Sequence, residues 1–128
     1  MPRGAMWTTM RAMFGRAGKT NTSSSLSDSV VKRMDAVRMK KNAIRCGDAT
    51  QRERSCFVGE VMSTRIVPRG ASHWFEVVIS DGTGKINGWF FGRKSIAGLQ
   101  LGSAVFFEGL VQLDEGEFTI ANPYYELL

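Results

Sequence analysis

The sequence predicts an all-β protein, a small barrel of five strands preceded by an amino-terminal helix and a flexible tail. Three observations support this fold class. Apolar and polar residues alternate in short runs from residue 43 onward, glycine-rich turns separate the runs, and the first run is long with a glycine inside it. A five-stranded sheet whose first strand is bent in this way can close into a barrel without leaving a long edge.

The amino-terminal third divides into a tail and a helix. Residues 1–25 contain no acidic residue and no sustained periodicity, which predicts a disordered basic tail. An organelle transit peptide is a minor alternative for the same composition. Residues 26–42 predict an amphipathic basic helix, because a capping box at Ser25 and Asp28 precedes apolar residues at helical spacing: Leu26, Val30, Met34 and Val37. The barrel domain is expected over residues 43–128.

The charge is unevenly distributed along the chain. Residues 1–54 hold 12 Lys or Arg and 4 Asp or Glu, whereas residues 55–128 hold 5 and 8. This asymmetry favours an anionic partner, nucleic acid or a membrane surface, that the tail approaches first; improved solubility is the simpler explanation. No run of residues is long and apolar enough to span a membrane, so a cytoplasmic protein without a membrane partner is expected.

Five strands follow in order. The first, 55–68, carries Gly59 in its interior, which indicates a bulge or sharp coil. Runs 74–80 and 85–92 form a hairpin around the turn DGTG. A short helical or irregular link, 93–102, leads to a second hairpin of 103–113 and 117–128. Gly59 and Gly109 are expected to relieve crowding where the first and fourth strands meet.

The order of these elements resembles the OB-fold. The segments that carry the resemblance are FVGEV, FEVVISDGTGKINGWFFG, LQLGSAVFFEGLV and ANPYYELL, within residues 43–128. They are similar to the OB-fold modules of anticodon-binding domains and of the wedge region of RecG-type helicases. The combination of RIVPRG, GRKSIAGLQLG and NPYYELL is similar to small stand-alone OB-fold proteins of actinobacteria, so the resemblance implies a bacterial nucleic-acid-binding protein.

Strand alternation places the aromatic residues. If Phe75, Val77 and Ile79 face inward, the paired strand turns Ile86, Gly88 and Phe90 inward as well. The outer face then carries Trp74 and Glu76 on one strand and Lys85, Asn87, Trp89 and Phe91 on the other. OB-folds receive oligonucleotides on this face of strands 2 and 3, with the loop between strands 1 and 2 closing over it. Single strands are bound by stacking and by cations. The predicted nucleic-acid-binding residues are Trp74, Trp89, Asn87, Lys85, Arg65, Arg69, His73, Arg93 and Lys94, with His73 in a loop.

Two alternatives remain open for this face. Trp89 could pack under the amino-terminal helix at Val30, Met34 and Val37, and the outer face of strands 2 and 3 could dock a protein partner or a second copy of the chain. Phe91 is expected to be buried beside the link. The remaining aromatics are assigned to the core or to barrel closure: Phe106, Phe107, Phe118 and Tyr124 or Tyr125.

The sequence offers little support for catalysis. His73 is the only histidine, no serine stands in a G-x-S-x-G turn, and no carboxylate pair has a recognisable spacing. Cys46, Cys56 and His73 are too widely spaced to indicate a zinc site. We therefore expect a non-enzymatic protein without cofactor or metal that binds single-stranded DNA or RNA, with little sequence preference, by stacking and phosphate neutralisation.

Overall fold

The computed structural model describes residues 28–128, and the predicted tail and Ser25 of the capping box lie outside this range. Of the helix predicted over 26–42, the structure shows the part from Asp28 to Lys41, and residues 26 and 27 lie outside the described range. The elements in chain order are α2 (Asp28–Lys41), the 3-10 helix η2 (Cys46–Asp48), β1 (Arg54–Arg69), β2 (Ser72–Ser80), β3 (Lys85–Phe91), β4 (Ala104–Leu110), β5 (Gln112–Asp114), β6 (Glu117–Ala121) and β7 (Tyr124–Leu127). The link between β3 and β4 is irregular.

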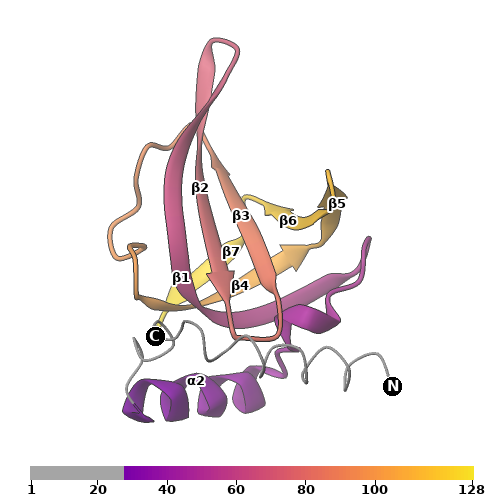
Figure 1. Cartoon of the computed structure of the whole chain (residues 1–128), viewed down its shortest axis with the longest axis vertical. Helices are drawn as coiled ribbons and strands as arrows, with labels where there is room; N and C mark the ends of the chain where they lie inside the picture. Colours follow the sequence, from indigo (N-terminus) through magenta and orange to yellow (C-terminus); the bar gives the residue numbers. More distant parts are fainter. Residues whose placement is uncertain (1–27) are drawn as a thin grey trace, which may run out of the picture.

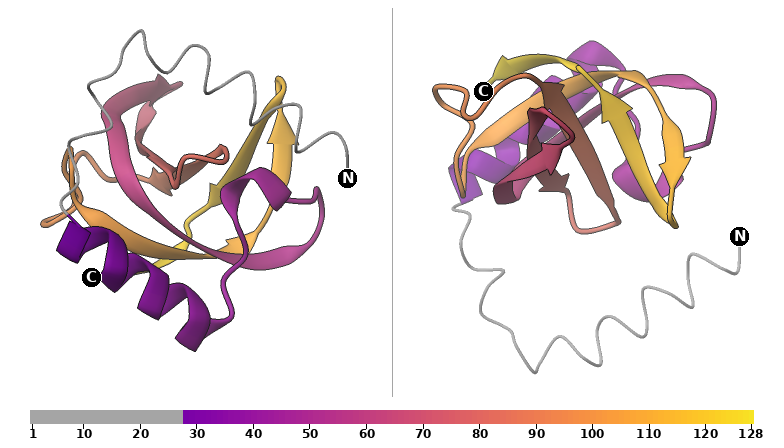
Figure 2. Two further views of the ribbon diagram at one scale, coloured as in Figure 1. Left: turned by 60° about the horizontal axis from the view of Figure 1, so that its bottom comes forward. Right: turned by 90° about the horizontal axis from the view of Figure 1, so that it is seen from above.

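The strands form one sheet in the order β5-β6-β3-β2-β1-β4-β7, antiparallel except for the β3–β6 pair. The sheet has seven strands where the sequence predicted five, because each strand of the second hairpin is interrupted. Val111 separates β4 from β5 by forming backbone hydrogen bonds with Arg52 and Glu53. Asn122 separates β6 from β7 with a left-handed φ of 47°. Along the chain, β5 continues β4 and β7 continues β6. The sheet curls into a barrel (Figure 2), but its end strands β5 and β7 do not pair with each other, so the barrel is not closed.

β1 bends because it serves two partners. It pairs with β4 up to Glu60 and with β2 from Glu60 to Arg69, with a register shift between Val61 and Ser63. Gly59 lies at this change of partner, where an added Cβ would lie 2.9 Å from the carbonyl oxygen of Ser80. The sequence-based prediction that Gly59 relieves crowding is confirmed.

Beyond the bend, β1 and β2 project from the barrel as a two-stranded arm (Figure 1). The loop expected between them is reduced to Gly70 and Ala71, and Gly70 takes a φ of 59° that suits a tight hairpin turn. His73 lies in β2 opposite Pro68, so its placement in a loop was wrong. The expectation that no long edge remains was also wrong, since β1 has β2 as its only described neighbour along the arm.

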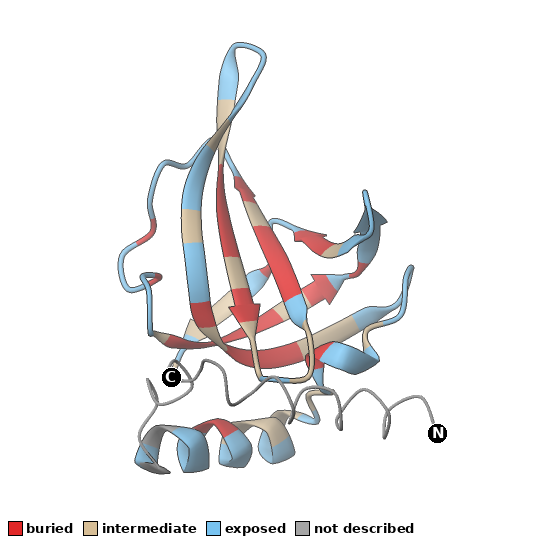
Figure 3. Cartoon of the chain, in the orientation of Figure 1, coloured by how far each residue is buried: buried red, intermediate tan, exposed pale blue. Residues whose placement is uncertain are grey.

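The core follows the predicted alternation. Phe75, Val77, Ile79, Ile86 and Phe90 are buried inside the barrel (Figure 3). Gly88 faces inward without leaving a void, because the ring of Phe107 fills the place of a side chain, 2.7 Å from where a Cβ would be. Of the other assigned aromatics, Phe106 and Phe107 are buried, Phe118 and Tyr125 pack partly against the core, and Tyr124 is exposed.

α2 docks on the barrel away from β3. Met34 is buried against Val58, Ala104 and Phe106, and α2 lies below β1 and β4 in Figure 1. Trp89 is not among these contacts, so the hypothesis that the helix covers Trp89 was wrong. No helix within residues 28–128 is long and apolar enough to cross a membrane.

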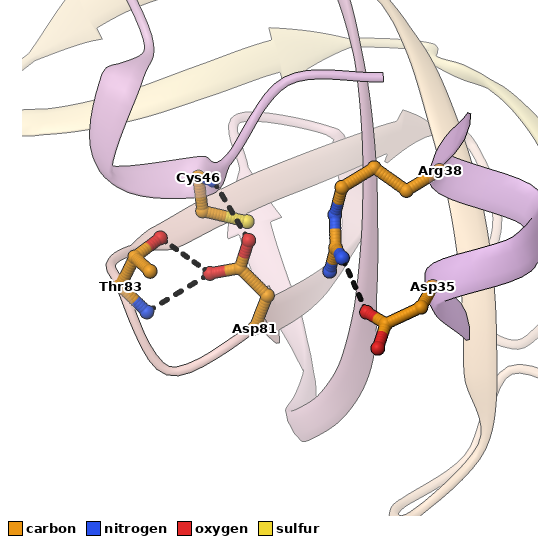
Figure 4. A network of polar contacts seen from close by, with 5 residues as sticks. All are labelled: Asp35, Arg38, Cys46, Asp81 and Thr83. Atoms are coloured by element: carbon orange, nitrogen blue, oxygen red, sulfur yellow. Dashed lines mark hydrogen bonds and ion pairs between the residues drawn. The ribbon is translucent and has the colours of Figure 1, made fainter. Parts of the chain in front are cut away.

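A polar network fastens the chain before β1 to the turn between β2 and β3 (Figure 4). The Asp81 carboxylate accepts hydrogen bonds from the backbone N–H of Cys46 and from both the N–H and the hydroxyl of Thr83. Gly47 donates its N–H to the Thr83 hydroxyl. Both cysteines are free, and burial raises the pKa of the Cys46 thiol. The network closes this end of the barrel.

Asp81→Ala should lower the free energy of unfolding by about 2 kcal/mol, because it removes the acceptor of three hydrogen bonds. Chemical denaturation followed by circular dichroism measures the change. Ser80→Ala is the matched control, since the Ser80 hydroxyl accepts one exposed bond and should contribute less than about 0.5 kcal/mol. Equal effects of the two substitutions would contradict a fastening role for Asp81.

Candidate nucleic-acid interface

The outward-facing side chains of β1, β2 and β3 line up in cross-strand rows, because the register aligns residues of the same face. One row is Arg65–Glu76–Trp89, and the next is Val67–Trp74–Phe91. The two rows cross the outer face of β2 and β3, for which the sequence predicted nucleic-acid binding. Side chains within a row, or in adjacent rows, are close enough to make contact.

Three aromatic side chains gather on this face, and we call Trp74, Trp89 and Phe91 the aromatic cluster. The rings of Trp74 and Phe91 stack with centroids 4.2 Å apart and an interplanar angle of 29°. Trp89 tilts against Trp74 at 5.0 Å. Both tryptophans are half-buried, whereas Phe91 is 40% exposed. The expectation that Phe91 is buried was wrong, because β3 carries its side chain outward onto Trp74.

Arg69 also contacts the aromatic cluster. Its guanidinium carbon lies 4.5 Å from the centroid of Trp74 and 5.6 Å from that of Trp89, within the range of cation–π attraction. Arg69 pairs with Ser72 across the hairpin, so its long side chain reaches diagonally to Trp74. Trp74 therefore contacts both a phenyl ring and a guanidinium.

A buried carboxylate anchors the same face. Glu76 is 5% exposed and accepts hydrogen bonds from Arg65 Nε, from Trp89 Nε1 at 3.0 Å and, more weakly at 3.4 Å, from Asn87 Nδ2. The hydrogen bond to Glu76 raises the pKa of Arg65. Glu76 thus fixes the ring of Trp89 and holds one cation beside it. The sequence analysis did not select Glu76, although strand alternation had placed it on the face of Trp74.

Asn87 lies on this face but is buried. Its amide nitrogen donates to Glu76 and, at 2.8 Å, to Oε1 of Glu117, which follows the turn between β5 and β6. Both N–H donors of the Asn87 amide are therefore used in hydrogen bonds to carboxylates, and Asn87 links β3 to the start of β6 after the β5–β6 turn. Only its carbonyl oxygen remains for another partner.

A cleft of about 640 Å³ runs between the arm and the β5–β6 turn. Its charged lining consists of two cations, Arg65 and Lys85, and two carboxylates, Glu76 and Glu117. The cations lie on β1 and β3 at the edge of the cleft, and the turn that closes the other side is acidic, with Asp114 and Glu115 beside Glu117. The cleft adjoins the aromatic cluster through Glu76.

The remaining predicted residues are placed differently. Lys85 is exposed at the start of β3. His73 is half-buried in β2, where strand alternation puts it on the face of Phe75, opposite to that of Trp74, so its assignment to the binding face was wrong. Arg93 and Lys94 are exposed in the link after β3, where Lys94 lines a separate groove with Arg65. The structure therefore brings together Arg65, Arg69, Trp74, Asn87 and Trp89, with Lys85 at the margin. Within residues 28–128, no group of three or more His, Cys, Asp or Glu is placed to hold a metal ion.

Comparison with known proteins identifies the fold. A replication factor A related protein from Methanobacterium thermoautotrophicum aligns with a TM-score of 0.52 and 16% identity over 67% of this chain and 90% of its own. The OB domain of a Thermoplasma acidophilum protein aligns with a TM-score of 0.54 and 15% identity over 67% and 86%. No curated protein matches the chain at a significant level.

A small barrel of this topology, with aromatic and basic side chains on its β2–β3 face, defines the class of OB-fold proteins. The model of the OB-fold nucleic acid binding domain of the anticodon-binding type matches residues 56–128, more than half of the chain. The chain belongs to this family, as its sequence resemblance predicted.

Proposed function

We propose that this protein binds single-stranded nucleic acid without strong sequence preference and without catalysing a reaction. Bases stack on the aromatic cluster, and neighbouring arginine and lysine side chains neutralise the phosphates. Family membership supports nucleic-acid binding in general. The single-stranded preference rests on the exposed aromatic surface, since bases within a duplex present no free ring faces.

The main observation that supports the proposal is the contact of Trp74 with both Arg69 and Phe91. Phe91 offers an exposed ring, and Arg69 is the cation nearest to Trp74. Base–aromatic stacking contributes about 1–3 kcal/mol per base and tolerates any sequence. Arg65 and Lys85 lie along the adjoining cleft at positions that suit phosphate contacts. The acidic turn repels phosphates, which directs a strand toward the cationic side of the cleft.

The proposal is tested by titrating the protein with fluorescein-labelled oligothymidine at several salt concentrations, with a duplex of equal length as competitor. Binding should quench tryptophan fluorescence, and the quenching should persist in Trp7→Phe, because the responding tryptophans are Trp74 and Trp89. Loss of the quenching in Trp7→Phe, or equal affinity for the duplex, would contradict stacking on the aromatic cluster.

A protein-interaction module is the rival function for the same face, because Phe91 and the two tryptophans form an apolar patch. In that case light scattering should report a dimer or a co-purified partner that oligothymidine does not displace. A monomer whose mobility shifts with oligothymidine at moderate salt would support nucleic-acid binding and exclude this rival.

Deleting residues 1–25 should weaken oligonucleotide binding and flatten its salt dependence while the barrel stays folded. The deleted segment holds four Lys or Arg residues and no acidic residue. Each lost phosphate contact lowers the slope of log K against log salt by about 0.7. Anisotropy titrations at four salt concentrations measure the slope. An unchanged slope would show that the segment takes no part in binding.

A further inference from the structure

The arm leaves one strand edge open. β1 pairs with β4 only through Glu60, and from Met62 to Arg69 its only neighbour among residues 28–128 is β2. An open edge presents unpaired backbone N–H and C=O groups, which can pair with another extended chain. This edge lies beside the irregular link between β3 and β4 (Figure 1).

The register shows which backbone groups face outward. His73 accepts a hydrogen bond on its carbonyl oxygen from the N–H of Gly92, so His73 directs its backbone groups to β3 and away from β1. Backbone direction alternates along an antiparallel strand. The β1 residue opposite His73 is Pro68, and therefore Thr64, Ile66 and Pro68 turn their backbone groups to the open edge.

Pro68 limits this edge. A proline has no N–H to donate. The backbone groups of Pro68 point to the open edge, so the missing donor costs no hydrogen bond to β2. The available groups are the N–H of Thr64 and Ile66 and the C=O of all three outward-facing residues. Five residues of an added strand span about 16 Å, the length from Thr64 to Pro68.

A groove of about 530 Å³ lies beside this edge. Ile66 is 50% exposed at its rim, and the buried side chains of Ile96 and Leu99 lie at its base. The only charged residues in its lining are Arg65 and Lys94, both cations. The groove therefore combines an apolar floor, an open strand edge and positive charge.

We propose that the open edge of β1 binds an extended segment of a partner protein, added as a further antiparallel strand, in which apolar and acidic residues alternate. Directly opposed residues of an antiparallel pair share a face of the sheet. Peptide residues that bond to Thr64 and Ile66 thus place their side chains next to Ile66, and these are apolar. The intervening residues lie on the face of Arg65 and are acidic.

The observations favour a peptide over a nucleic acid at this edge. Thr64 and Ile66 present donors and acceptors at the spacing of a strand, and a peptide backbone matches both, as in other cases of strand addition. A sugar–phosphate backbone carries no donors in such a ladder. The open edge and its groove contain none of the aromatic cluster, and Arg65 is the one charged residue that they share with the cleft. The backbone groups of Thr64 and Ile66 take no part in the function proposed above, so the proposal does not depend on it.

The test uses the full chain and a fluorescein-labelled eight-residue peptide of alternating valine and glutamate, followed by anisotropy. A peptide of alternating valine and lysine is the charge control and should bind at least about ten-fold more weakly. Two further probes carry N-methyl groups on either the valine or the glutamate amides. Methylation of the valines removes the donors that face β1 and should weaken binding at least about ten-fold, whereas methylation of the glutamates should not.

Variants of the protein and amide exchange give independent readouts. Ile66→Pro removes one outward donor and should weaken binding at least about ten-fold, while Ile66→Val keeps the donor and should bind like the native chain. On saturation with the valine–glutamate peptide, the amides of Thr64 and Ile66 should gain protection from exchange. Those of Arg65 and Val67, which face β2, should change little.

Equal losses from both N-methylated peptides would overturn the proposal, whether or not Ile66→Pro folds. Peptide binding without protection of Thr64 and Ile66 would overturn it as well. Protection of these two amides by oligothymidine and not by the peptide would assign the edge to nucleic acid and thereby contradict the proposed partner.

Discussion

The double variant Trp74→Ala/Phe91→Ala should bind single-stranded oligothymidine on the order of 100-fold more weakly than the native protein, since each stacking surface contributes about 1–3 kcal/mol. The two rings touch, so the combined loss should be smaller than the sum of the two single losses. Anisotropy titration of the single and double variants measures each contribution and the coupling between them.

Phe91→Ala alone separates binding from stability. Because Phe91 is 40% exposed, its removal should change the free energy of unfolding by less than about 1 kcal/mol while weakening binding about ten-fold. Tyr124→Ala is the control, since Tyr124 is an exposed aromatic on β7, at the opposite end of the strand order from β3. If Tyr124→Ala weakens binding as much as Phe91→Ala, the aromatic cluster is not the binding surface.

Glu76→Ala should lower the free energy of unfolding by about 3 kcal/mol, the second large effect. Removal of this buried carboxylate leaves the donors of Asn87 and Trp89 without their acceptor and frees Arg65. Glu76→Gln retains the shape and one acceptor oxygen, so its loss should be about half as large. Urea denaturation measures both changes.

The matched control for Glu76→Gln is Glu115→Gln, the same chemical change in the exposed β5–β6 turn, which should alter stability by less than about 0.5 kcal/mol. Glu76→Gln should also strengthen oligonucleotide binding at low salt, because it removes a negative charge from the cleft. A fully stable Glu76→Ala protein would show that the carboxylate does not anchor Trp89.

Strand alternation predicted the face correctly because side-chain direction has a period of two whatever the partner strand is. Trp74 and Trp89 point outward for this reason, and the six residues of β2 and β3 that were predicted to face inward are all buried. The role of Glu76 was not predictable in this way. Its burial depends on having Arg65 on one side and Trp89 on the other, and that row exists only once the register of three strands is known.

Three of the errors share one physical cause, which is dependence on contacts distant in sequence. The break at Val111 arises from backbone bonds to Arg52 and Glu53, some 60 residues earlier. The docking of Met34 on Phe106 joins the helix to β4, and the apolar spacing of the helix alone does not specify that partner. Phe91 was assigned to the core from its neighbours in the link, whereas its contact with Trp74 comes from pairing with β2.

The guanidinium of Arg69 lies over the ring of Trp74, with its carbon 4.5 Å from the ring centroid. If bases stack on Trp74 as proposed, a base arriving from that side must displace the guanidinium, and the departing cation is then released next to an incoming phosphate. Part of the base-stacking energy then only compensates for the lost cation–π contact. The net gain in binding free energy is therefore smaller than on an uncovered ring. In the free protein the guanidinium covers part of this apolar ring, which should lower the tendency of the face to self-associate.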